Sequence, residues 1–308
     1  MSHVFYERTN VCRLLTDIGA QPADCPDSSV RWPISFTHRE LYSGGLPCIF
    51  MPTNRAGRPL KTVETTLELV ELLQREDGLT LEQIATEAKL AKSTAHGHVK
   101  TLEKHGYVVN EDDRYYLGMQ FLNRGGYVAN RKGLYKLAES KVEKLAMETE
   151  ERAQFVIEEH GKGTYVRTTV GSNAVVTDSR IGKCTHLHIA AAGKAILAHL
   201  SETRVEEIID QQGLPAFTPD TISDREELFD SLERIRDRGY AFNREETVEG
   251  LRSVGVPVVT SSGHVEGAFS VSGPTNRLRG EWFETEIPNL LLGVANELEL
   301  NIEYNQET

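Results

Sequence analysis

The sequence predicts an α+β protein in which a small domain of three helices and a β-hairpin precedes a larger mixed domain. The length of 308 residues suits two domains, since one domain usually takes ~100–200 residues. Helical spacing of apolar residues recurs three times between 61 and 105, and two strand-like runs follow it. Beyond residue 138, strand-like runs and helical patterns are mixed.

Composition and charge narrow the class of protein. Apolar residues make up 39% and charged residues 26% of the chain, as in a globular protein with a buried core. There is no apolar run of the ~18–20 residues that a membrane span needs and no secretory signal after Met1, so we expect a cytoplasmic protein. The net charge of −12 argues against nucleic-acid binding, but residues 119–308 carry −9 of it and residues 89–107 are locally +3.

Residues 1–54 differ from the rest of the chain. They contain several prolines and no sustained helical or strand period, so we expect an irregular or disordered extension. A sharper hypothesis places the true start at Met51, with 1–50 as an upstream extension of the reading frame; peptides from 1–50 in the native protein would exclude it. We expect reduced thiols without a disulfide framework or a zinc site from the four cysteines, Cys12, Cys25, Cys48 and Cys184.

Residues 55–118 have the pattern of a helix-turn-helix with a β-hairpin behind it. The predicted elements are a basic arm with Arg55 and Arg58, helices over 61–75, 80–88 and 92–105, and strands over 107–109 and 115–117. Thr80 and Gln83 have the spacing of a capping box at the start of the second helix. We expect Ser93 or Thr94 to open the third helix.

The third helix has one apolar and one polar face. With Ala95, Val99 and Leu102 turned inward, hydroxyls and lysines point away from the core, and both suit phosphate oxygens or guanine edges. The hairpin resembles a wing, with Arg114 placed to reach a DNA backbone or minor groove. Three small helices can also form an ordinary interaction module with a solvated charged face. The candidate DNA-binding residues are Arg55, Arg58, Ser93, Thr94, His96, Gly97, Lys100, Thr101, Lys104 and Arg114.

The rest of the chain is predicted to be a linker and a larger domain. Residues 119–137 form the linker and the start of an amphipathic helix over 131–149, and residues 138–305 form the domain. Ser223 and Glu226 have capping-box spacing. We expect strands over 153–160, 164–170, 174–179, 240–243, 253–259 and 265–272, and helices over 190–200, 203–211, 223–239 and 282–302.

Several separated motifs resemble the IclR family of transcription regulators. In the first domain they are Leu90-Ala-Lys-Ser-Thr-Ala-His96, Lys100-Thr-Leu-Glu-Lys-His-Gly-Tyr107 and Tyr116-Leu-Gly118. In the second they are His188-Ile-Ala-Ala-Ala-Gly-Lys-Ala-Ile-Leu197, Arg238-Gly-Tyr-Ala-Phe-Asn-Arg-Glu-Glu246, Gly250-Leu-Arg252 and Ser270-Val-Ser-Gly-Pro-Thr-Asn-Arg277. The resemblance covers roughly 58–305. It implies a winged helix-turn-helix and a GAF-like α/β effector-binding domain.

The resemblance also implies where an effector binds. Carried over to this chain, the family's pocket residues are Ala191, Ala192, Asn243, Ser253, Ser270 and Ser272. Some relatives have an acidic residue at 243 and a cysteine at 253, whereas this chain has Asn243 and Ser253, so a neutral pocket for a small carboxylate or a sugar-derived metabolite is expected here. In the recognition helix, relatives usually carry a basic or bulky residue where this chain has Gly97, so no base contact is assigned there.

An enzyme is the alternative class. Cys184, His186 and His188 alternate as strand residues that share a face, but no fourth metal ligand is evident, and His188 is expected to hydrogen-bond locally. Glu245 and Glu246 are adjacent and would point to opposite sides of a strand. The chain has no nucleophile elbow, zinc-protease motif or Walker loop. We therefore predict no catalytic residue, no metal and no cofactor.

The partners follow from this interpretation. We expect a ligand-responsive activator or repressor of a catabolic operon that binds a double-stranded DNA operator and a small-molecule effector. By resemblance it forms a homodimer or homotetramer, since a two-fold protein reads two half-sites of a palindrome. The alternatives are a small-molecule enzyme with an accessory helix-turn-helix and a protein-interaction adaptor. The acidity of the chain is compatible with an archaeal, salt-loving source.

Overall fold

The computed structural model describes residues 59–175 and 179–306 of the chain. The expected extension over 1–54, the alternative start at Met51 and the basic-arm residues Arg55 and Arg58 lie outside the described residues. No helix in the described part is both long enough and apolar enough to cross a bilayer.

The first domain has the predicted order of three helices and two strands, with one additional short strand. Its elements are α3 (Lys61–Glu76), β1 (Leu79–Thr80), α4 (Leu81–Glu87), α5 (Lys92–Lys104), β2 (Val108–Glu111) and β3 (Arg114–Leu117). The strand β1 pairs with β3, which in turn pairs with β2. A two-residue strand has no periodic signature, which is why the sequence did not reveal it.

Helix starts in this domain test the predictions about caps. The capping box at α4 is confirmed: Thr80 accepts from the Gln83 amide at 3.3 Å, and the Gln83 side chain accepts from the Thr80 amide at 2.9 Å. The expectation that Ser93 or Thr94 opens the third helix was wrong. Helix α5 begins at Lys92 after Ala91, with no side-chain cap, so both hydroxyl residues lie in its first turn.

The predicted linker contains a helix that the sequence did not reveal. The structure has α6 (Gln120–Asn130) followed by α7 (Gly133–Thr149), whereas a single helix over 131–149 was expected. Helix α6 buries none of its residues and carries Gly125 and Gly126, so it lacks both an inward stripe and strong intrinsic propensity.

The second domain is built on a sheet of six strands in the described part, in the order β6-β5-β4-β9-β8-β7 with every neighbouring pair antiparallel. The strands are β4 (Arg152–Glu159), β5 (Lys162–Val170), β6 (Cys184–His186), β7 (Ala241–Arg244), β8 (Leu251–Val259) and β9 (Val265–Pro274). A strand expected over 174–179 is absent at 174–175; residues 176–178 are outside the described part.

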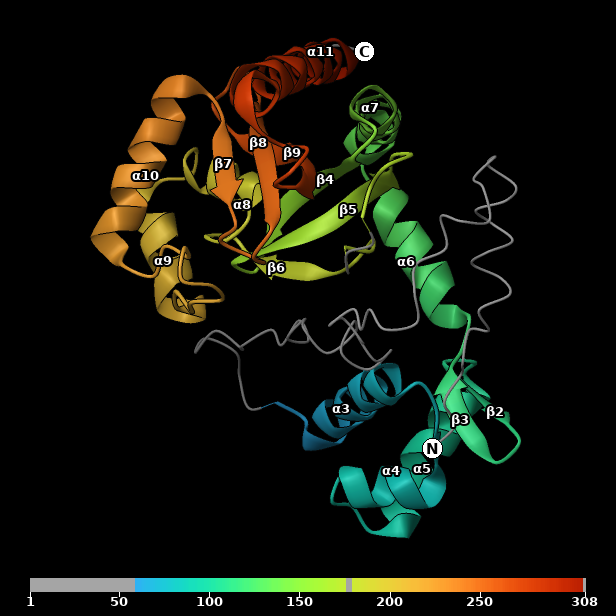
Figure 1. The fold of residues 1–308 in the computed structure, drawn as a ribbon. Helices are drawn as coiled ribbons and strands as arrows, with labels where there is room; N and C mark the ends of the chain where they lie inside the picture. Colours follow the sequence, from blue (N-terminus) through green and yellow to red (C-terminus); the bar gives the residue numbers. More distant parts are fainter. Residues whose placement is uncertain (1–58, 176–178, 307–308) are drawn as a thin grey trace, which may run out of the picture. The chain divides into compact units, whose positions relative to one another are not determined.

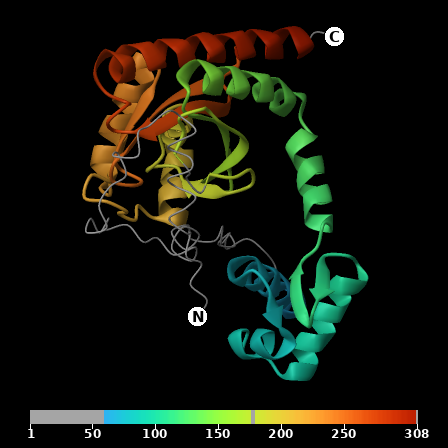
Figure 2. The same cartoon turned by 45° about the vertical axis from the view of Figure 1, so that its right-hand side comes forward.

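Helices cover both faces of this sheet (Figures 1 and 2). Helices α7 and α11 (Ile287–Gln306), the latter preceded by the π-helical turn Trp282–Glu286, pack on one face. On the other face α8 (Ala191–Leu197) lies against β8 and β9, and α9 (Glu202–Gln212) and α10 (Arg225–Arg238) pack around it. The cap of α10 is shifted by one residue from the expected Ser223 box, because Asp224 accepts from the Glu227 amide.

Alternation along the central strands separates an apolar face from a polar one. Ala153, Phe155, Val254, Phe269 and Val271 all belong to the core beneath α7 and α11. Their neighbours in sequence point to the opposite face, as the two-residue period of a strand requires. These neighbours include the buried polar residues Arg152, Gln154, Ser253, Ser270 and Ser272.

Gly255 lets α8 approach this polar face. A Cβ atom at Gly255 would lie 2.4 Å from the Ala191 carbonyl carbon and 2.5 Å from the Ala192 nitrogen. These are backbone atoms at the start of α8, so they cannot rotate away. Gly97 in α5 is the opposite case, since a Cβ there would meet no atom within 4 Å.

The two glycines therefore give opposite predictions. We expect Gly255→Ala to lower the free energy of unfolding of the second domain by about 1–3 kcal/mol, because α8 must move off the sheet. We expect Gly97→Ala to raise the stability of the first domain by about 0.5–1 kcal/mol, because alanine costs less entropy in a helix interior. Denaturant unfolding of both variants checks this; a neutral Gly255→Ala would contradict the close approach.

Candidate DNA-reading helix and effector site

Helix α5 presents one exposed polar surface. Ala95, Val99 and Leu102 are buried in the core of the first domain, as predicted. The structure places the predicted DNA-facing residues of this helix together on the exposed side, namely Ser93, Thr94, His96, Gly97, Lys100, Thr101 and Lys104. His98 is turned toward α3, where its Nδ1 lies 2.8 Å from the Thr66 hydroxyl.

The polar residues of α5 differ in whether they already have hydrogen-bond or ion-pair partners within the protein. Lys100 Nζ donates to Glu103 at 2.6 Å, and this hydrogen bond raises the pKa of the lysine. The Thr101 hydroxyl donates to the Gly97 carbonyl at 2.7 Å, which leaves its oxygen lone pairs but not its proton for a partner. Among the described residues Lys104, like Lys92 at the start of the helix, has no ion-pair partner, so it is a cation that α5 can offer to a phosphate.

The wing has an acidic tip. Glu111, Asp112 and Asp113 are exposed at the turn between β2 and β3, and both aspartates have positive φ. Arg114 follows them, and its Nη2 donates to the Gly78 carbonyl at 2.9 Å. Carboxylates at the tip repel phosphates, so the geometry favours contact through α5 and the side of the wing rather than through the tip.

On the polar face of the second sheet, strand pairing brings distant residues into two rows. Asn243, Ser253, Ser272 and Arg152 are opposite one another across β7, β8, β9 and β4. The row beside it runs through Gly255, Ser270, Gln154 and Thr168. The predicted effector residues Ser253, Ser270 and Ser272 thus lie side by side, and Ala191 and Ala192 cover Gly255 next to them.

Three residues of these rows were missed from the sequence. Arg152 and Gln154 are 6% and 4% exposed, and the Ser270 hydroxyl lies 3.1 Å from Gln154 Oε1. The Thr168 hydroxyl is buried without a partner. Polar residues alternating with apolar ones on β4 were the available signal, but the sequence alone does not show that β4 pairs with β9.

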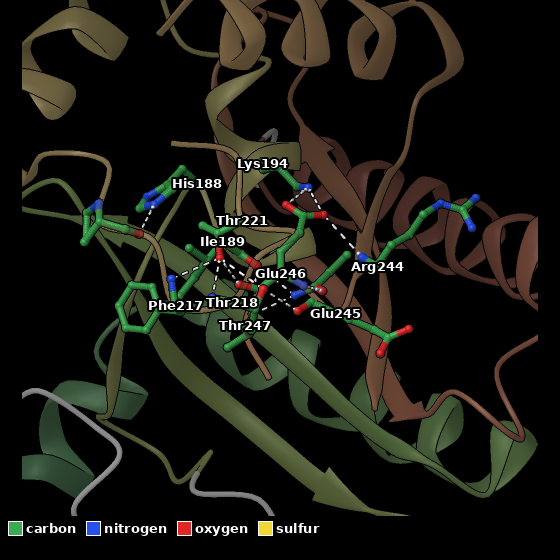
Figure 3. A network of polar contacts seen from close by, with 12 residues as sticks. His188, Ile189, Lys194, Phe217, Thr218, Thr221, Arg244, Glu245, Glu246 and Thr247 are labelled. Carbon is green, nitrogen blue, oxygen red and sulfur yellow. Dashed lines mark hydrogen bonds and ion pairs between the residues drawn. The ribbon is translucent and has the colours of Figure 1, made fainter. Parts of the chain in front are cut away.

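The predicted effector residue Asn243 is already fully hydrogen-bonded. Its Nδ2 donates to the Ile189 carbonyl at 2.7 Å and to the Thr247 hydroxyl at 2.6 Å, and its Oδ1 accepts from the Glu246 amide at 3.0 Å. The Thr247 hydroxyl also donates to Ile189 at 2.8 Å (Figure 3). Asn243 therefore ties the loop after β7 to the segment before α8, and a ligand would have to compete for these bonds.

A buried ion pair holds the same loop to α8. Lys194 Nζ lies 2.5 Å from Glu246 Oε1, and both side chains are more than nine-tenths buried (Figure 3). Burial lowers the pKa of Lys194, and the Glu246 carboxylate opposes that shift. Glu245 has positive φ and accepts from the Gly250 amide at 2.8 Å. The two glutamates follow β7 rather than lying on it, and neither is a free acid–base group.

The histidines near β6 have local roles. His188 Nε2 lies 3.1 Å from the Pro215 carbonyl oxygen, as a donor in a local hydrogen bond. Its ring is 5.6 Å from that of His186. No group of three potential metal-binding side chains occurs among the described residues. Cys184 is disulfide-bonded, which departs from the expectation of reduced thiols.

The buried His188 predicts a pH effect on stability. Burial lowers the pKa of His188 to about 4, whereas an unfolded histidine titrates near ~6.5. Between these values the unfolded chain binds a proton that the folded chain excludes, so stability falls as the pH drops through this window. The loss attributable to His188 is up to about 3 kcal/mol.

The variant His188→Gln isolates the contribution of this histidine to the pH dependence of stability. The difference in free energy of unfolding between wild type and variant should shrink between about pH 7 and about pH 4.5, because only the wild type has this imidazole to charge. Denaturant unfolding at several pH values measures it. A difference that stays constant across the window would show that His188 is not buried in its neutral form.

Both domains of this chain are similar to domains of known proteins. The profiles "IclR helix-turn-helix domain" and "Bacterial transcriptional regulator IclR C-terminal" match residues 62–112 and 127–299. The "Probable HTH-type transcriptional regulator ArcR" of Halobacterium salinarum is 33% identical over 254 residues, covering 81% of this chain and 97% of ArcR.

Solved structures of regulators of this type are also similar to this chain. The crystal structure of the Thermotoga maritima IclR matches with a TM-score of 0.67 at 27% identity, covering 78% of this chain and 98% of that one. The PobR inducer-binding domain from Acinetobacter, a double mutant in complex with 3-hydroxybenzoic acid, matches with a TM-score of 0.50 at 26% identity and covers 53% and 96%. The chain belongs to the IclR family of helix-turn-helix transcription regulators.

Proposed function

We propose that this ligand-responsive regulator reads its operator with the exposed side of α5 and senses a small carboxylate or sugar-derived metabolite on the polar face of the second sheet. The single observation that carries the DNA part is the exposed side of α5, which has hydroxyls and an open helix start at its N-terminal end and Lys104 at its last residue. Such groups position a helix on phosphates. The arm residues Arg55 and Arg58, which lie outside the described residues, and the wing residue Arg114 complete the proposed set.

The effector part rests on the two polar rows. Ser253, Ser270 and Ser272 are buried hydroxyl residues next to the start of α8. A double mutant of the similar PobR inducer-binding domain forms a complex with 3-hydroxybenzoic acid, which supports a small organic acid as the class of effector. We propose that the ligand favours one arrangement of the DNA-reading domains over another, so that it shifts a population.

Further parts of the proposal concern assembly, location and source. A homodimer or homotetramer on a palindromic operator in the cytoplasm suits a regulator of this family. The relative from Halobacterium salinarum supports a salt-loving archaeal source. Regulation without catalysis is favoured over an enzyme because the buried carboxylates Glu246 and Glu151 are paired with Lys194 and Arg277.

Salt-dependent DNA binding tests the proposal. Binding to a labelled duplex from upstream of the chain's own gene should weaken with salt, because lysines release counterions from phosphates. We expect Lys104→Ala to weaken binding and to flatten the plot of log affinity against log salt by about one unit. Fluorescence anisotropy at several salt concentrations measures the slope.

Matched variants sharpen this test. Glu103→Gln should strengthen binding, because it releases Lys100 from its ion pair. Lys144→Ala on α7, where the lysine pairs with Glu148, should leave the slope unchanged. An unchanged slope in Lys104→Ala would remove this residue from the phosphate contacts. The absence of any salt-dependent binding would favour the protein-interaction adaptor.

A further inference from the structure

Arg152 is a buried cation with too few partners. It is the first residue of β4, at the centre of the sheet, and only 6% of its surface is exposed. Its Nη2 donates to the Val175 carbonyl at 3.1 Å, whereas its Nε is buried and has no partner. No carboxylate of the described residues lies within ion-pair distance of it, and burial lowers its pKa.

Two cations of comparable burial in this domain are paired with carboxylates, whereas Lys162, 7% exposed, has no ion pair among the described residues, and the buried Nε atoms of Arg167 and Arg252 also have no hydrogen-bond partner. Lys194 is paired with Glu246. Arg167, 5% exposed on the neighbouring strand, lies 3.4 Å from Glu139 and donates to Asn130 at 3.0 Å. Its position opposite Phe155 puts it on the other face of the sheet. An unpaired buried charge is costly, so the difference at Arg152 calls for an explanation.

The surroundings of Arg152 indicate the missing partner. Ser272 lies opposite it on β9, and Ser253 lies beyond Ser272 on β8. In the adjoining row the Thr168 hydroxyl is also buried without a partner, beside Gln154. This face thus offers one guanidinium among neutral hydroxyl and amide groups.

We propose that Arg152 is the anion-binding residue of the effector site, where its guanidinium pairs with the carboxylate of a small hydroxylated organic acid. Hydroxyls of the same ligand would bond to Thr168, Ser253 and Ser272. The guanidinium has planar, paired donors that match a carboxylate, and a single cation matches a single acid group. This inference rests on the proposed function, and it names the chemistry of the ligand and the residue that selects it.

If Arg152 binds the acid, replacing it by an apolar residue should raise the stability of the free protein and lower its affinity for the acid. Without ligand, Arg152 is an uncompensated buried charge, so replacing it by an apolar residue of similar length should stabilise the free protein. The same change should remove the attraction for the acid. A residue with only a structural role would instead lose stability on replacement.

The experiment uses the full chain, thermal unfolding and titration calorimetry. The probes are D-gluconate, D-glycerate and 3-hydroxybenzoate, each paired with its neutral analogue glucose, glycerol or 3-hydroxybenzyl alcohol, with inorganic phosphate as a further arm. We expect at least one acid to bind while its neutral analogue does not, and Arg152→Met to lower that affinity about 30-fold or more. Arg152→Lys should retain part of the affinity, and Arg152→Met should unfold at a higher temperature than wild type when no ligand is present.

Arg167→Met is the matched control. It removes a paired cation from the other face, so it should lower the unfolding temperature and leave acid binding unchanged. Three results would overturn the proposal: Arg152→Met destabilises the free protein as Arg167→Met does, phosphate alone binds, or no acid binds. The DNA affinity of the wild type without acid separates the two claims. Retained DNA binding with no acid binding refutes this inference alone, whereas loss of DNA binding by wild type refutes the proposed function.

Discussion

Burial of polar side chains on one face of a sheet is the constraint on which the second domain depends. A buried donor or charge without a partner costs free energy, so the space above such a face must supply partners. The apolar face meets this constraint simply, under α7 and α11. The other face meets it through α8, the loop after β7 and, in our proposal, a bound organic acid at Arg152.

This division explains how the parts near the site support one another. Gly255 allows α8 to lie close to the sheet, and the Lys194–Glu246 pair fixes the loop after β7 against α8. Asn243 completes the tie by bonding to Ile189. These residues are satisfied within the protein, so they shape the site, while the unpaired groups on β4 and β5 are left for a ligand. A ligand that orders this face could bias elements beyond it only if its affinity differs between two states.

The sequence predicted features that repeat locally and missed those that depend on pairing across the fold. The inward stripe of α5 and the Thr80–Gln83 box follow from spacing alone, and the structure has both. Helix α6 escaped prediction because it buries nothing. Arg152 escaped because its environment is set by β9, more than a hundred residues away in the chain. The family resemblance identified Ser253, Ser270 and Ser272 as candidate effector residues. Only the register of β4, β9 and β8 shows that they lie next to Arg152.

The central claim is that occupancy of the polar face is coupled to DNA binding. Its most direct measurement is the affinity of the full chain for its operator duplex with and without a saturating organic acid, at one fixed salt concentration. We expect a change of about 5-fold or more in either direction, the usual range for linked sites. The acid should bind more tightly or more weakly to the DNA complex by the same factor. Equal DNA affinity with and without a bound acid would contradict the account.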